Sequence, residues 1–141
     1  MSFLLEIITP ERRAYEETVD DVNVPTVEGH IGVLGHHIPL FTILSEGEIK
    51  ISQGSKAFFL AIGGGFMEVS ANHVSILVSR AVHADELNEA EIKKAEDSAR
   101  DLIANPARGV ELAAAQAILR RSLLEMKVLR RHRGASLTVG R

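Results

Sequence analysis

The hydrophobic period of this sequence changes near residue 84, and that change constrains the fold more than any other feature. Before it, short apolar segments alternate with polar residues at every second position, as in a strand. After it, apolar residues recur every three or four positions, as in a helix. Two periods in 141 residues predict two units, a β-rich unit over residues 1–84 and a helical unit over residues 85–141.

The first unit is predicted to be a β-sandwich of many short strands. Its apolar segments are rich in β-branched and aromatic residues and are separated by Gly, Pro and Asn turn signals. The intervals are too short for the helical crossovers that parallel strands need. The run Gly63–Gly65 is expected to be a hairpin turn. The predicted strands are residues 4–8, 19–24, 48–52, 57–62, 66–69 and 74–79.

The second unit is predicted to be an antiparallel helical hairpin. Asn88 followed by Glu91 is typical of a capped helix start, and Asn105-Pro106 ends the first helical pattern. A second helix is expected from about residue 109 to residue 133, with Gly134 as its stop and residues 135–141 frayed. The apolar surface of this second helix is too wide for one hairpin partner. Either the β-unit covers the remainder, or another subunit does.

The segment 28–40, EGHIGVLGHHIPL, is predicted to be a shaped, rigid binding loop rather than a strand or a helix. Glycine permits backbone conformations that other residues resist, and proline fixes its own φ. Shaped loops on a rigid scaffold often carry binding residues. This segment is therefore the first candidate site.

Composition excludes several kinds of chemistry. The chain has no cysteine, so a disulfide, a thiol nucleophile and a thiolate metal site are excluded. The histidines lack carboxylates at ligand spacing, and the serines and glycines lack nucleophile or phosphate-loop motifs. No catalytic residue, metal site or cofactor is predicted. Residues 120–141 hold seven Arg or Lys against one Glu, a charge of +6 that suggests an acidic partner.

The order and spacing of several motifs resemble the epsilon subunit of F-type ATP synthases over roughly residues 3–133. These motifs are EGHIGVLGHHIPL at 28–40, EGEIKI at 46–51, FLAIGGGFMEV at 59–69 and HVSILV at 73–78. The resemblance implies a non-catalytic subunit of the central stalk, or rotor, of a proton-translocating enzyme. It would fasten the gamma subunit to the membrane ring, couple ion flow to ATP synthesis and restrain ATP hydrolysis through its C-terminal helices.

The resemblance also implies which residues make these contacts. The sandwich would meet the gamma subunit and the ring of membrane subunits, with His37 toward gamma and His30 toward the ring. The C-terminal helix would meet an acidic segment of a beta subunit, and an alpha subunit is a further candidate partner. The interface residues are Glu28, Gly29, His30, Ile31, Gly32, Leu34, His37 and Pro39. The basic residues for the acidic partner are Arg120, Arg121, Lys127, Arg130 and Arg131.

An ATP motif that some members of this family carry at the start of the second helix is degenerate here. Its positions include Val110, Glu111, Ala114 and Ala115. Glu111 replaces an aspartate and Ala114 replaces an arginine, which removes a guanidinium suited to nucleotide contacts. Weak or absent ATP binding is predicted.

Two other functions are compatible with the composition alone. One is a free-standing β-domain that binds a small ligand and dimerises through its helical hairpin. The other is a nucleic-acid binder that uses the basic tail, although that tail lacks aromatic residues for base stacking. The sequence shows neither a signal or transit peptide pattern nor an apolar run long enough to cross a bilayer. With the resemblance, the expected location is peripheral, on the cytoplasmic face of a bacterial inner membrane.

Overall fold

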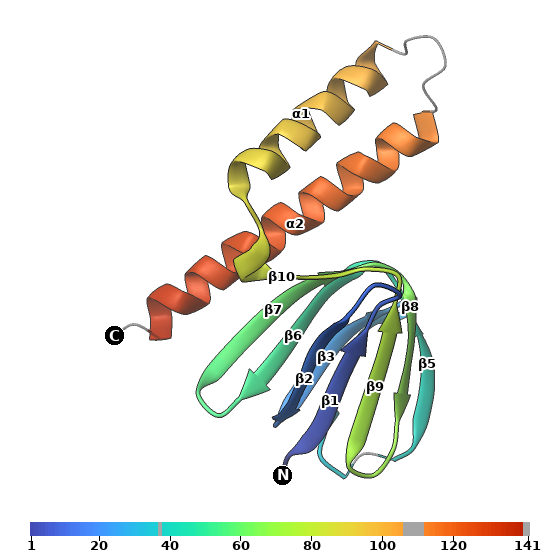
Figure 1. The fold of residues 1–141 in the computed structure, drawn as a ribbon, viewed down its shortest axis with the longest axis vertical. Helices are drawn as coiled ribbons and strands as arrows, with labels where there is room; N and C mark the ends of the chain where they lie inside the picture. The colour runs from blue at the N-terminus through green and yellow to red at the C-terminus, as the bar shows by residue number, and fades with distance from the viewer. Residues whose placement is uncertain (37, 106–111, 140–141) are drawn as a thin grey trace.

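The computed structural model describes residues 1–36, 38–105 and 112–139. Within these residues, ten strands are followed by a 3-10 turn and two helices (Figure 1). The first five strands are β1 Phe3–Ile8, β2 Arg13–Val19, β3 Asp21–Thr26, β4 Gly29–Leu34 and β5 Leu40–Leu44. The others are β6 Gly47–Gln53, β7 Lys56–Ile62, β8 Gly65–Val69, β9 His73–Val78 and β10 Ala81–His83. The turn η1 (Ala84–Glu86), α1 (Glu89–Ala104) and α2 (Leu112–Val139) complete the chain.

The strands form two layers, so the predicted β-sandwich followed by a helical hairpin is confirmed. The first layer has the order β10-β7-β6-β3 with β4 beside β3, and the second has the order β5-β8-β9-β1-β2. The two layers are joined where Thr26 of β3 pairs with Leu44 of β5. Strands β1 and β9 run parallel, and the other pairs within the layers run antiparallel.

The main core lies between the two layers. Alternate residues of each strand point inward, as Phe3, Leu5 and Ile7 do in β1. Burying such side chains is the main favourable term in folding. The remaining buried members of this core are Val19, Val22, Val24, Val33, Leu44, Ile49, Ile51, Leu60, Ile62, Met67, Val69, Val74, Ile76, Val78 and Ala81.

Strand β7 is buried on both faces at its C-terminal end. Leu60 and Ile62 belong to the main core, whereas Phe59 and Ala61 form a second cluster with Val128 of α2. A strand covered on both sides needs apolar residues at consecutive positions, which explains the run FFLAI. The helix therefore packs on the outer face of β7, at one side of the first layer (Figure 1).

Within the described residues the helices follow the predicted hairpin, except at the end of the second helix. The predicted start of the second helix, near residue 109, lies outside the described residues. Asn88 caps α1 by accepting a hydrogen bond from the Glu91 amide at 3.1 Å. However, α2 continues through Gly134 to Val139, so the predicted stop and the predicted fraying of 135–139 are wrong. A glycine inside a helix costs about 1 kcal/mol relative to alanine. Two contacts offset that cost, because Arg133 pairs with Glu89 of α1 at 2.7 Å and Ala135 packs on the β7 cluster.

Residues 28–40 are not mainly a loop, so this part of the prediction is wrong. Gly29–Leu34 forms β4, which pairs antiparallel with β3, and β5 begins at Leu40. The glycines serve the connections instead. Gly29 has φ 118° in the tight β3–β4 turn, and a Cβ on Gly35 would lie 2.6 Å from the Met1 carbonyl oxygen. The predicted strand 19–24 is likewise two strands, which meet at Asp20.

The run Gly63–Gly65 is not a hairpin turn, because β7 and β8 are not partners. It carries the chain from the first layer to the second. A Cβ on Gly65 would collide with the Leu77 carbonyl oxygen, and a Cβ on Gly63 would collide with the Ser79 hydroxyl. These two glycines are needed because strand β9 and the residues after it pass directly against the corner.

Candidate functional site

The outer face of the second layer carries a row of exposed apolar side chains. The strand register places Ile43 of β5, Phe66 of β8 and Leu77 of β9 opposite one another. Phe41 lies two residues from Ile43, and its ring contacts that of Phe66 with centroids 5.3 Å apart. We call these four residues the apolar face; their exposed fractions are 63% for Phe41, 60% for Ile43, 37% for Phe66 and 36% for Leu77.

A shallow groove of about 380 Å³ continues the apolar face toward the glycine corner. Phe66 and Leu77 line it together with Ile8 and Pro10. Scattered exposed apolar residues are ordinary, but a contiguous apolar surface marks an interaction site. Helix α2 packs on β7 of the first layer, whereas the described part of the chain places no helix on the apolar face (Figure 1). The second layer thus offers an apolar sheet face to a partner.

The helical hairpin contacts the sandwich through a small apolar cluster. Val128 is fully buried against Phe59 and Ala61 of β7. Leu124 and Ala135 are partly buried at the edge of the same cluster. The stripe that faces α1 is separate and includes Met126 and Leu129. The predicted excess of apolar surface on α2 is therefore divided between α1 and the β-unit.

Part of that excess remains exposed on α2. Leu112 is 51% exposed, and Ile118 and Leu123 are each 44% exposed. Ala113, Ala114 and Ala117 are exposed as well. The β-unit thus covers one part of the helix, and another part is open to a further partner.

Ion pairs join α2 to the sandwich on both sides of the apolar cluster. Arg131 pairs with Glu48 of β6 at 2.9 Å, and its guanidinium lies 5.3 Å from the centre of the Phe59 ring. Arg80, which follows β9, pairs with Glu125 at 2.9 Å, and both of these side chains are largely buried. These contacts hold α2 on the first layer.

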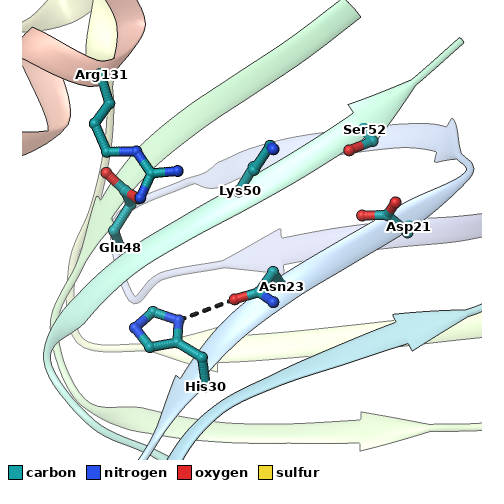
Figure 2. A pocket seen from close by; sticks show the side chains of 7 residues that line it. All are labelled: Asp21, Asn23, His30, Glu48, Lys50, Ser52 and Arg131. Atoms are coloured by element: carbon teal, nitrogen blue, oxygen red, sulfur yellow. Dashed lines mark hydrogen bonds and ion pairs between the residues drawn. The ribbon is translucent and has the colours of Figure 1, made fainter. Parts of the chain in front are cut away.

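A polar cleft of about 390 Å³ lies beside the Glu48–Arg131 pair (Figure 2). His30 lines it from β4 and is hydrogen-bonded to Asn23 of β3 at 2.9 Å. Burial raises the pKa of the Glu48 carboxyl, although Arg131 and Lys127 act in the opposite direction. The other lining residues are Asp21, Lys50 and Ser52.

The structure distributes the predicted interface residues over β4 and its two connections. Glu28 is exposed in the β3–β4 turn, and Leu34 is exposed at the end of β4. Ile31 is instead packed against the main core. His30 lies within β4 and not in a loop as predicted. Gly29 and Gly32 are exposed in β4, Pro39 is exposed before β5, and His37 lies outside the described residues.

The five predicted basic residues are all exposed on α2. Two of them have partners within the chain, because Arg121 pairs with Glu125 at 3.4 Å and Arg131 pairs with Glu48. Of the degenerate ATP motif, Ala114 is exposed and Ala115 is buried on α2. Val110 and Glu111 lie outside the described residues. No group of three or more potential metal ligands occurs among the residues that the structure describes.

Sequence reasoning missed the apolar face and the ion pairs between the two units. A signal for the face was present in LFTIL at 40–44 and FM at 66–67, where apolar residues occupy both strand faces. Such a strand needs a cover on each side, and the core supplies only one. The pairing of Glu48 with Arg131 had no comparable signal, because the two residues lie in different units of the chain.

Comparisons with known proteins identify the family. Residues 2–84 match the family model described as ATP synthase, Delta/Epsilon chain, beta-sandwich domain. The ATP synthase epsilon chain of Herpetosiphon aurantiacus is 40% identical over 94% of this chain and 99% of its own length. The chain belongs to the ATP synthase epsilon chain family. The epsilon chain of Chloroflexus aggregans is 36% identical over 94% of this chain and 96% of its own length.

Two solved structures share the epsilon chain fold. A chain in the mitochondrial ATP synthase of Euglena gracilis aligns with a TM-score of 0.65 and 22% identity, over 96% of this chain and 81% of that chain. A chain in the central stalk/c-ring structure of the Tetrahymena thermophila enzyme aligns with a TM-score of 0.55 and 15% identity, over 92% and 97%. The family confirms the resemblance and the assignment as a non-catalytic subunit of ATP synthase. In the described part of the chain, no helix combines the length and hydropathy that a membrane crossing requires.

Proposed function

We propose that this epsilon chain is a central-stalk subunit that binds the gamma subunit through the apolar face. The supporting observation is the row of Ile43, Phe66 and Leu77, exposed on the layer opposite the helical hairpin. A sheet face of this kind can take a partner without displacing α2. Membership of the epsilon chain family supports this position in the enzyme, as does the shared fold with a chain of the Tetrahymena thermophila central stalk and c-ring.

The β3–β4 turn and the connection after β4 are proposed to meet the ring of membrane subunits. Glu28 in the turn, and Leu34 and Pro39 around the connection, expose their side chains. By holding gamma and the ring together, the sandwich would couple ion flow to ATP synthesis. The chain would then sit at the cytoplasmic face of a bacterial inner membrane, held there only through the complex.

The helical hairpin is proposed to restrain ATP hydrolysis. Among the described residues, the hairpin contacts the sandwich through one small apolar cluster and two ion pairs. A second position of the hairpin with a similar free energy is therefore physically reasonable. In that second position the exposed apolar residues of α2, among them Ile118 and Leu123, would pack elsewhere in the enzyme. Its basic residues would meet an acidic segment of a beta subunit, with the charges supplying orientation.

The gamma contact is tested by binding of the purified gamma subunit to variants of the apolar face. Ile43→Ser and Phe66→Ser should each weaken binding at least tenfold, because burying such a side chain contributes roughly 1.5–3 kcal/mol. Val27→Ser is the matched control, since Val27 is exposed but lies in the β3–β4 turn. Unchanged affinity for both face variants, measured by calorimetry, would exclude the apolar face as the gamma site.

A further inference from the structure

Glu48 is a buried carboxylate that is only half satisfied. Glu48 is 5% exposed and lies on β6, where it faces Arg131 of α2. One oxygen, Oε1, accepts the ion pair from Arg131 at 2.9 Å. The other, Oε2, is buried and has no hydrogen-bond partner among the described residues. A buried charged oxygen without a partner is unfavourable, and a proton on that oxygen would remove most of the penalty.

The partner of Glu48 comes from the hairpin and not from the sandwich. Arg131 has a side chain that is 47% exposed, so it is accessible to an acidic group of another protein. If Arg131 were withdrawn while α2 stayed docked, the buried Glu48 carboxylate would lose its ion-pair partner. Removing one partner of a buried pair costs far more than the pair contributes. The docked helix is thus sensitive both to the position of Arg131 and to the charge on Glu48.

We propose that the protonation state of Glu48 controls the release of α2 from the sandwich. The helix docks most firmly when Glu48 is neutral, and the docked state tolerates an ionised Glu48 only while Arg131 pairs with it. Capture of Arg131 by an acidic partner would therefore release the helix, and acidification would oppose the release. This inference rests on the proposed movement of the hairpin and gives that movement a specific trigger.

The direction of the pH effect follows from the surroundings of Glu48. Burial raises the pKa of its carboxyl more than the facing cations lower it. Undocking of α2 would expose the carboxyl and return its pKa toward the ordinary value of 4.5. The docked state then binds the proton of Glu48 more tightly than the undocked state does. The additional stability of docking is therefore complete at pH values below the pKa of Glu48 in the undocked state. It is lost as the pH rises through the higher pKa of Glu48 in the docked state. The charged groups that face Glu48 are Arg131 and Lys127 of α2, His30 of β4 and Lys50 of β6, with Asp21 of β3 in the same cleft.

The test measures docking of α2 in the full chain by energy transfer between two dyes. The chain has no cysteine, so Ser55→Cys and Gln116→Cys create two labelling positions, both exposed and outside the contact surface. The docking constant is taken from urea titrations extrapolated to water at pH 5 and pH 8. Helicity measured in parallel separates undocking of the hairpin from its unfolding. For the unmodified sequence, docking should be stronger at pH 5 than at pH 8.

Three variants assign the effect to Glu48. Glu48→Gln should dock at pH 8 at least as firmly as the unmodified chain and should lose the pH dependence. Arg131→Gln should weaken docking about tenfold or more at pH 8 and less at pH 5, because the loss of the ion-pair partner affects only the ionised carboxylate. The double variant should dock more firmly at pH 8 than Arg131→Gln alone. His30→Gln is the control, since His30 is a second ionisable side chain that faces Glu48, and this variant should keep the pH dependence.

The proposal would be overturned if Glu48→Gln docked less firmly than the unmodified chain at pH 8, or if it kept the full pH dependence. If Glu48→Gln did not fold, Arg131→Gln alone would decide, because Arg131 lies on the surface. An equal loss at both pH values would then contradict the proposal. These measurements need only the isolated chain. They therefore stand apart from any failure of the hairpin to restrain hydrolysis in the assembled enzyme.

Discussion

Truncation of Val128 to alanine isolates the apolar contact that holds α2 on the sandwich. Val128 is fully buried against Phe59 and Ala61 and belongs to neither of the ion pairs. The change removes two methyl groups, worth about 1.6 kcal/mol by transfer, and the residual cavity brings the loss to about 2 kcal/mol. Docking should therefore weaken roughly 15- to 30-fold.

The assay is the energy-transfer measurement of docking in the full chain. Leu123→Ala is the matched control, because Leu123 is 44% exposed on the same helix and lies outside the β7 cluster. Its docking constant should stay within about twofold of the unmodified chain. A Val128→Ala variant that docks as firmly as Leu123→Ala would show that the β7 cluster does not hold the helix. In the assembled enzyme, Val128→Ala should also slow ATP hydrolysis further, because a larger share of hairpins would be free to extend.

The remaining predictions concern the sandwich, the connection between the units, and nucleotide binding. Gly65→Ala should destabilise the chain by about 1–3 kcal/mol in thermal unfolding, because the added Cβ would collide with a carbonyl oxygen of β9. Gly64→Ala is the control and should not destabilise the chain in this way, because the atom nearest to its added Cβ would lie 3.5 Å away. Burial raises the pKa of Glu86, but hydrogen bonds, chiefly from Arg12, more than offset this and leave it lowered. The stability that this ionised carboxylate contributes to the fold is present above pH 4.5 and is lost as the pH falls through the lowered pKa. Glu86→Gln should therefore reduce the fall in melting temperature at acidic pH, and an unchanged fall would contradict this. Isothermal titration should detect no micromolar ATP binding, and such binding would show that the arginine of the family motif is dispensable.

The hairpin was predictable because its determinants are local. The 3.6-residue period and the Asn88 cap act within one or two turns, and α1 follows them from Glu89 to Ala104. The end of α2 was not predictable in the same way. Gly134 is a local stop signal, but Ala135 packs on the β7 cluster, and no local pattern reveals that contact.

The β-sandwich fold class was predictable from the sequence, but the strand assignment was wrong at segments that contain several glycines. In β4, glycines occur inside a paired strand, and in Gly63–Gly65 they form a corner between layers rather than a hairpin. A glycine in the sequence indicates an unusual backbone conformation or the close approach of another segment. Neither of these specifies which strand is the partner. The apolar face was accessible in principle from β5, where apolar side chains occupy both faces. The burial of Glu48 could not be predicted from the sequence, because Glu48 pairs with a residue of α2 that is distant in the sequence.

The most direct test of the account compares ATP synthase complexes that carry the whole chain with complexes that lack residues 85–141. The sandwich keeps the apolar face, so the truncated chain should still copurify with the gamma subunit. Hydrolysis of ATP should be faster in the truncated complex, because the proposed restraint has been removed. Equal hydrolysis rates in two complexes of equal subunit content would contradict the proposed role of the hairpin, and loss of the truncated chain from the complex would contradict the role of the apolar face.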